Sequence, residues 1–326
     1  MSLHTKTDLE TIHRLKMERH SEIFSFPDKF VDSLPELPVT RRHTITEPVE
    51  IDGIGSFSNQ PLRIRLSPCA DGRPYMVHNG TQLPLDVNHV TTGLHNIQLG
   101  EIKIIEHPLA LMHALRLDVN FELTVPDFPT FDECDGPYLD AVRPRLQPVD
   151  TIPVITVAHP VAVRFERGYF IMEPDQGNQE LWIDHQITYP GKSIGTRRIQ
   201  LALNPERFAF LCRARTPSFR STEETAQIYQ LARQKAIADY PITDQNVLFV
   251  DPDQIHNPRA RYDHEGFNYE FLLHEVIDII AWIKLVEVYY GGNFVGRLTT
   301  HFFGHPEQVE AARLFCSRPE LIVTVA

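Results

Sequence analysis

One stretch of the chain is a long apolar run that carries two polar side chains four positions apart. Residues 270–282 read EFLLHEVIDIIAW, and apolar side chains fill most of the positions. Such a run predicts a buried helix. Residues four apart on a helix lie on the same face, so His274 and Asp278 can converge on one point. We therefore expect a helix that packs in an apolar layer and keeps one chemically active face.

The spacing of His274 and Asp278 suits a metal ion, and it equally suits a simple hydrogen bond. Zinc binds histidine nitrogen and carboxylate oxygen, and a catalytic zinc site uses three protein ligands. The third ligand would come from another part of the chain. Taken alone, a hydrogen bond between the two side chains is the commoner arrangement, so this pair by itself does not define a metal site.

A second pair, Glu106 and His107, stands where a strand-like run meets a helix. Neighbours on a helix point about 100° apart, so they cannot hold one ion equally well. One could be a ligand while the other takes a proton from the attacking water in a hydrolysis. Alternatively, Glu106 is a helix-terminal carboxylate favoured by the dipole, and His107 faces solvent.

Length and composition limit the classes of protein that fit. The chain has 326 residues, which is room for two domains. Its formal charge of −12 argues against a nucleic-acid partner held on a basic surface. The four cysteines form no CxxC pair, which favours free thiols in a reducing compartment. With no signal-like or membrane-spanning apolar segment, we expect a cytoplasmic protein, and we expect a monomer.

The order of strand-like and helix-like segments predicts an α+β protein. Alternating apolar and polar residues predict a strand at 61–68, and residues 100–117 pass from a strand into a helix. Three prolines near residues 143–155 predict a linker. The expected organisation is an N-terminal extension over 1–45, a first α+β domain over 46–148 and a second over 149–326.

Taken together, Glu106–His107 and His274–Asp278 resemble the UDP-3-O-acyl-N-acetylglucosamine deacetylases of lipid A biosynthesis. Five further segments match that family in order, and the resemblance covers roughly residues 46–316. The segments are VEIDGIGSF (49–57), TTGL (91–94), PDFPTFDECDGPY (126–138), RART (213–216) and GGNFVGRLTTHFFGH (291–305).

The resemblance implies two α+β domains of similar layered topology that sandwich the active site between helical layers. It also implies a Zn²⁺ ion held by His107, His274 and Asp278. Glu106 would be the general base, and Thr216 of the RART segment would help to hold the oxyanion. The substrate would be an acylated sugar nucleotide.

The resemblance leaves two candidates for the general acid. Matching the glycines of the last segment gives His305, whereas counting without a gap gives His301. Residues four apart in a strand share a side, so we expect both on one face of an extended strand. We prefer His305 because the glycines and the following helix then agree.

Five positions depart from the family pattern, and one of them is Ser56, which stands in the opening motif in place of a leucine. Glu275 replaces a lysine, which should weaken contact with a diphosphate. Trp282 replaces an aspartate that supports the catalytic histidine, so we expect a lower pKa for that histidine. Phe57 stands in the opening motif in place of a histidine, and Glu133 stands in place of the glycine after Asp132.

Three functions fit this pattern. The first is a zinc deacetylase of the lipid A pathway or close to it. The second is a zinc amidohydrolase on a different N-acylated or nucleotide-linked compound, which the Glu275 exchange favours. The third is a catalytically weak relative that binds a ligand and serves as a binding or regulatory protein.

Residues 222–240 predict an amphipathic helix in the region where the family builds an acyl-chain passage. We expect Ile228, Leu231 and Ile237 on its apolar side. They could line such a passage, although core packing is the commoner use of an apolar stripe.

Overall fold

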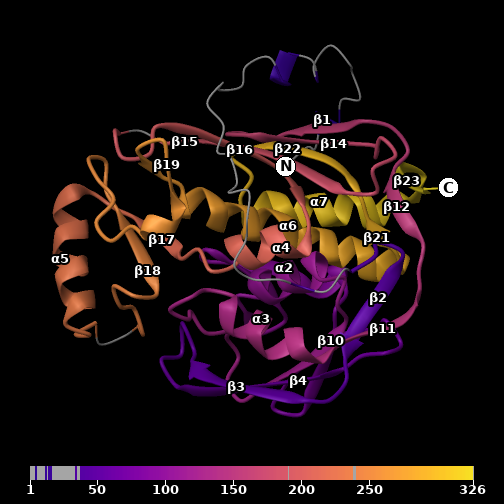
Figure 1. Ribbon diagram of the computed structural model, residues 1–326, viewed down its shortest axis with the longest axis horizontal. Coiled ribbons are helices and arrows are strands. Elements are labelled where there is room, and N and C mark those ends of the chain that lie inside the picture. The colour runs from indigo at the N-terminus through magenta and orange to yellow at the C-terminus, as the bar shows by residue number, and fades with distance from the viewer. Residues whose placement is uncertain are drawn as a thin grey trace.

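The computed structural model describes residues 4–5, 12, 14–16, 34, 37–189, 191–237 and 240–325. In these ranges no helix is both long and apolar enough to cross a membrane. The chain folds into two large sheets on the outside with helices between them, and smaller sheets complete the structure (Figure 1).

The first sheet has five strands drawn from residues 49–123. Strand β10 lies at its centre, antiparallel to β4 and parallel to β5. The strands in spatial order are β3 (Val49–Ile54), β4 (Pro61–Pro68), β10 (Val119–Leu123), β5 (Tyr75–His78) and β6 (Thr81–Pro84). The predicted strand at 61–68 is confirmed as β4, whose inward residues Leu62, Ile64 and Leu66 are buried.

The second sheet has six strands drawn from residues 161–301 and from the N-terminal segment. Strand β22 lies inside this sheet, antiparallel to β14 and parallel to β15. The strands in spatial order are β1 (His4–Thr5), β13 (Val161–Arg164), β14 (Tyr169–Glu173), β22 (Gly296–His301), β15 (Leu181–Thr188) and β16 (Thr196–Leu203).

The helices lie mainly between the two sheets. Figure 1 shows α2, α6 and α7 there, whereas α5 lies at one end of the molecule beside β17 and β18. The helices are α2 (Glu106–Ala114), α3 (Gly136–Val142), α4 (Pro205–Leu211), α5 (Thr222–Arg233), α6 (Glu270–Tyr290) and α7 (His305–Ser317). The expected α+β fold with helical layers between two domains is confirmed.

Helix α6 is the buried helix that the apolar run predicts, and it is longer than the run. It continues to Tyr290 and ends at Gly291, whose φ of 66° is the left-handed cap that glycine adopts at low cost. It packs closely on α2 and on α7. Its apolar side chains therefore hold the two sheets together through one continuous core.

Shorter strands and turns of 3₁₀ helix complete the fold. They are β2 (Arg41–Ile45), β7 (Val90–Gly93), β8 (Asn96–Leu99), β9 (Ile102–Lys103), β11 (Leu146–Thr151), β12 (Val154–Val157), β17 (Thr216–Phe219), β18 (Val247–Val250), β19 (Asp263–His264), β20 (Phe267–Asn268), β21 (Asn293–Phe294), β23 (Ile322–Thr324), η1 (Val87–His89), η2 (Arg143–Arg145), η3 (Ala260–Tyr262) and η4 (Pro319–Leu321).

The segment near residues 143–155 is not the irregular linker that its prolines predict. It contains η2 and β11, and β11 pairs antiparallel with β2 in a two-stranded ribbon. Pro148 is tolerated because a ribbon strand has a free edge that needs no N–H donor. The boundaries at residues 45 and 148 stay predictions.

Part of the N-terminal extension covers the second sheet. Ile12 and Leu15 are buried in a small cluster with Tyr169 and Ile171. Alternate strand residues point to opposite faces, and Phe170 belongs to the main core, so this cluster lies on the outer face. The proline-rich segment 24–38 falls mostly outside the described residues.

The buried face of helix α5 differs from the predicted apolar face. Leu231 is 44% exposed, so its predicted burial is wrong. Ala232, four residues after Ile228, is the buried residue instead, and it packs with Val247 and Phe249. The helix ends at Arg233, and Ile237 joins the same cluster from the following turn.

Candidate metal centre

The pairing of α2 with α6 brings together three side chains that can hold a cation. His107 comes from the first turn of α2, and His274 and Asp278 come from α6. One ligand atom from each of the three lies within 4.8 Å of the others. His274 Nε2 and Asp278 Oδ2 are 3.7 Å apart, because residues four apart on a helix lie on the same face.

The hydrogen bonds at Nδ1 of both histidines leave Nε2 of each ring as the atom that can ligate a cation. His274 Nδ1 lies 2.9 Å from the carbonyl oxygen of Ala214, which can only accept. His107 Nδ1 lies 2.9 Å from Asp135 Oδ1, an acceptor as well. Both Nδ1 atoms therefore carry the proton, and the Nε2 lone pairs remain available, as in many metal sites.

The third side chain also fits a cation. Asp278 Oδ1 is buried, and no described residue forms a hydrogen bond with it. An unpaired buried carboxylate oxygen costs free energy unless a cation or a donor satisfies it. Two nitrogens and a carboxylate oxygen are the donor set of catalytic zinc sites, so the residues present fit a zinc ion.

Glu106 and His305 lie beside this group. Glu106 Oε2 accepts the Ile97 N–H at 2.9 Å, which fixes the carboxylate, and Oε1 lies 4.0 Å from His305 Nε2. Burial raises the pKa of Glu106 above its ordinary value. Burial alone would lower the pKa of His305, but Glu106 and Asp278 outweigh it and raise that pKa. Glu106 and His305 therefore both hold a proton more tightly than the same side chains do in water.

Trp282, which stands where the resemblance implies an aspartate, lies in the apolar core, and its expected effect on the pKa of the histidine stays a prediction. Trp282 stacks on Phe315 with a centroid distance of 5.6 Å and contacts Phe303, so it serves the apolar core. His305 nevertheless has a raised pKa, because the negative charge comes from Glu106 and Asp278 rather than from position 282.

His301 and His305 do not share a face as expected. His301 is the last residue of β22 and its ring lies 5.8 Å from that of Tyr169, on the outer side of the sheet. The strand then breaks at Phe302, whose φ is 46°, and His305 begins α7. The structure brings His305 to the group and places His301 away from it.

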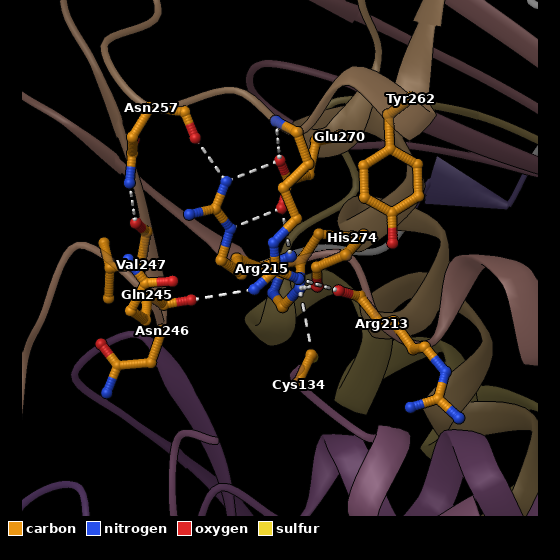
Figure 2. Close-up of polar contacts among 12 residues, drawn as sticks. Cys134, Arg213, Arg215, Gln245, Asn246, Val247, Asn257, Tyr262, Glu270 and His274 are labelled. Carbon is orange, nitrogen blue, oxygen red and sulfur yellow. Dashed lines mark hydrogen bonds and ion pairs between the residues drawn. The ribbon is translucent and has the colours of Figure 1, made fainter. Parts of the chain in front are cut away.

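Thr216 is also brought to the group, and a buried ion pair positions its segment. Its Oγ1 lies 3.2 Å from His274 Nε2. The preceding residue, Arg215, donates Nε to Glu270 Oε1 at 2.6 Å and Nη2 to Glu270 Oε2 at 2.8 Å. Figure 2 shows the Arg215 guanidinium between Glu270 and Asn257, close to His274. Glu270 is one turn before His274 on α6, so this pair ties Thr216 to the ligand helix.

Sequence reasoning missed two residues on the other side of the histidines, Cys134 and Asp135. Cys134 Sγ lies 3.4 Å from His107 Nδ1 and 3.6 Å from His274 Nδ1. The available signal was the Asp135–Gly136 step. The motif analysis aligned Asp132 with the family's aspartate, but Asp135, which is followed by Gly136, is the aspartate that contacts His107. At Gly136 an added Cβ would lie 2.5 Å from the Arg213 side chain.

Glu275 and Phe57 lie in different surroundings. Glu275 is half-buried, and no described residue forms a hydrogen bond or an ion pair with it. Burial, and then the charge of Asp278, raise the pKa of Glu275 to about 8. The Phe57 ring packs edge-on against Tyr240 at 6.5 Å, with the Lys103 ammonium 5.2 Å from its centre.

Comparison with known proteins decides the family. The sequence model of LpxC, the UDP-3-O-acyl N-acetylglycosamine deacetylase, matches residues 42–313. This chain belongs to that family. The resemblance expected from the motifs is confirmed, and the match includes both helices that carry the metal group.

Individual relatives are distant in sequence but match over most of their length. The chain is 25% identical to the UDP-3-O-acyl-N-acetylglucosamine deacetylase of Leptospira biflexa serovar Patoc over 298 residues, which cover 86% of this chain and 91% of that protein. It is 24% identical over 275 residues to the protein of that name from Synechocystis sp., covering 79% of this chain and 94% of the relative. The chain is therefore a divergent member of the family.

Proposed function

We propose that the protein is a zinc-dependent deacetylase that removes the N-acetyl group from UDP-3-O-acyl-N-acetylglucosamine or a closely related N-acylated sugar nucleotide. One observation carries the proposal. His107, His274 and Asp278 converge within 4.8 Å beside a buried carboxylate and a histidine that face each other, Glu106 and His305. Family membership gives this chemistry its substrate class.

The chain's own residues have complementary tasks in this proposal. A zinc ion held by His107, His274 and Asp278 would supply a Lewis acid for the amide carbonyl and lower the pKa of the attacking water. Glu106 takes the proton of that water, and its raised pKa makes it a better base than a free glutamate.

Breakdown of the tetrahedral intermediate needs a proton donor and a stabilised oxyanion. His305 faces Glu106 and its pKa is raised, so it holds its proton more tightly than a free imidazole and can give that proton to the leaving amine. The Thr216 hydroxyl, at the Nε2 edge of His274, is placed to donate a hydrogen bond to the oxyanion. His301 has no part in this assignment.

Glu275 favours a second candidate within the same chemistry. Glu275, next to His274, supplies no positive charge, so the site suits a ligand that carries less negative charge than a nucleotide diphosphate. In this second candidate the protein removes an acyl group from a different N-acylated compound.

A substrate comparison separates the two candidates. The rate of acetate release would be measured with UDP-3-O-acyl-N-acetylglucosamine and with the same acylated sugar lacking the nucleotide. The first candidate predicts a higher kcat/KM for the nucleotide-linked sugar, and Glu275→Lys should raise it further. A higher kcat/KM for the sugar without the nucleotide, reversed by Glu275→Lys, would support the second candidate.

A further inference from the structure

The Nδ1 edge of the His107 ring meets two further ligand-type side chains. Cys134 Sγ lies 3.4 Å from His107 Nδ1, Asp135 Oδ1 lies 2.9 Å from the same nitrogen, and the sulfur and the oxygen are 3.9 Å apart. Figure 2 shows the Cys134 sulfur pointing to the adjacent ring of His274. These three atoms form a compact group of thiol, imidazole and carboxylate.

The separations match those of a metal site. With zinc bonds of about 2.0–2.3 Å in a tetrahedral arrangement, neighbouring ligand atoms lie roughly 3.3–3.7 Å apart. The three observed distances bracket this range, so shifts of about half an ångström or less per pair would complete it.

Two independent features indicate that this group is a built site. Asp135 is 1% exposed, and its second carboxylate oxygen, Oδ2, is buried with no hydrogen-bond partner among the described residues. Cys134 is held at a φ of 48°, a left-handed conformation that a residue with a side chain rarely adopts. Such strain persists only where the surroundings fix it, and here it places the thiol between two imidazoles.

We propose that Cys134, His107 and Asp135 form a second metal position that takes a thiophilic divalent cation, such as Cd²⁺ or excess Zn²⁺. A thiolate ligand favours soft ions, which distinguishes this group from the nitrogen and oxygen set of His107, His274 and Asp278. Binding releases the thiol proton of Cys134, and the ring proton of His107 moves from Nδ1 to Nε2, so the imidazole stays neutral.

The two positions exclude each other. A neutral imidazole has one lone pair, so His107 ligates an ion either through Nε2, with His274 and Asp278, or through Nδ1, with Cys134 and Asp135. His274 cannot replace it at the second position, because its Nδ1–H donates to Ala214. A thiophilic ion at Cys134 therefore withdraws His107 from the first group and should inhibit any activity that depends on that group.

The test is optical and uses no substrate, so its outcome is independent of the proposed deacetylation. Metal-stripped full-length protein is titrated with Cd²⁺, the bound ion is counted by elemental analysis, and the ultraviolet thiolate-to-cadmium absorption is recorded. The matched control is Cys69→Ser. Cys69 is also a buried thiol next to a carboxylate, with Asp71 Oδ1 at 3.3 Å, but it follows β4 in the first domain.

Wild type and Cys69→Ser should show the thiolate band saturating at one Cd²⁺ per chain, and Cys134→Ser should lose it. Circular dichroism checks that each variant is folded, and Cys134→Ala serves as a second variant should the serine disturb packing. Wild-type protein that binds no Cd²⁺, or binds it without a thiolate band, overturns the proposal. A band that survives in both folded Cys134 variants, or disappears in Cys69→Ser, overturns it as well.

Discussion

Glu106 is held by a single backbone donor and faces His305, so its second oxygen is free to take a proton. Replacing it by glutamine keeps the shape and the Ile97 contact but removes the base. Glu106→Gln should lower kcat by about 10²- to 10⁴-fold, the usual contribution of a general base. Bound zinc, measured by elemental analysis, should be unchanged. Equal turnover in the two proteins would remove Glu106 from the mechanism.

The pH dependence of kcat/KM should be bell-shaped, with both limbs shifted to higher pH. Glu106 acts unprotonated, so activity rises with pH through its pKa, which lies above the ordinary 4.5. His305 acts protonated, so activity falls with pH through its pKa, which lies above 6.5. His305→Gln should leave a low activity without the alkaline limb, and an alkaline limb that persists in this variant would contradict the assignment.

At the scale of residues, the sequence predicted the candidate site residues that lie close together in a short motif. Adjacent Glu106–His107 and the four-residue spacing of His274 and Asp278 were readable because a helix has a fixed period. Asp135 and Cys134 were not, because a loop has no period that predicts where its side chains point. The raised pKa of His305 was not predicted for a related reason: its charged neighbours, Glu106 and Asp278, are distant from it in sequence.

Helix α6 depends on an ion pair at its first residue. Glu270 is fully buried, and Arg215 is 2% exposed. Removing one partner of a buried pair leaves an uncompensated charge and costs about 3–5 kcal/mol. Glu270→Gln should lower the free energy of unfolding by that amount, which is measured as a lower denaturant midpoint. It should also weaken zinc binding, because His274 lies one turn further along the helix.

The matched control for this prediction is an exposed ion pair. Asp52 accepts from Arg63 Nε at 2.8 Å on the surface of the first sheet, where solvent screens the interaction. Asp52→Asn should leave both the denaturant midpoint and the zinc affinity unchanged. Equal midpoints for Glu270→Gln and Asp52→Asn would show that the buried pair does not hold α6 in place.

At the scale of elements, the long periodic segments were predictable and the ends were not. The strand at 61–68 and the start of α6 follow from alternation and apolar content. The break at Phe302 was missed because an aromatic residue gives no sign of a left-handed backbone. Counting along a continuous strand predicted His301 and His305 on one face, whereas the break at Phe302 places them in different surroundings.

The whole molecule joins its halves through charges as well as through apolar packing. Near the end of α6, Lys284 Nζ lies 2.7 Å from Asp118 Oδ1, and Glu287 Oε1 lies 3.0 Å from His113 Nδ1. Both partners come from the end of α2 or just after it. These pairs were not predictable, because a charged residue in an apolar run gives no indication of a partner some 170 positions away.

Because the metal group joins α2 to α6, the ion should stabilise the whole fold. Free zinc at 100 times its dissociation constant stabilises a protein by about 2.7 kcal/mol. Chelation should therefore lower the melting temperature of wild-type protein, and zinc should restore it. His107→Ala, which lacks the ligand that both proposed metal positions share, should melt at the same temperature with and without zinc. A wild-type melting temperature that does not respond to zinc would contradict the three-ligand site.

The most direct measurement is acetate release from UDP-3-O-acyl-N-acetylglucosamine by zinc-loaded protein, with His274→Ala as the blank. The account predicts catalytic release of acetate, many turnovers per chain, that the blank abolishes and that chelation stops. No release from a protein that demonstrably holds one zinc ion per chain would contradict the proposed activity on this substrate.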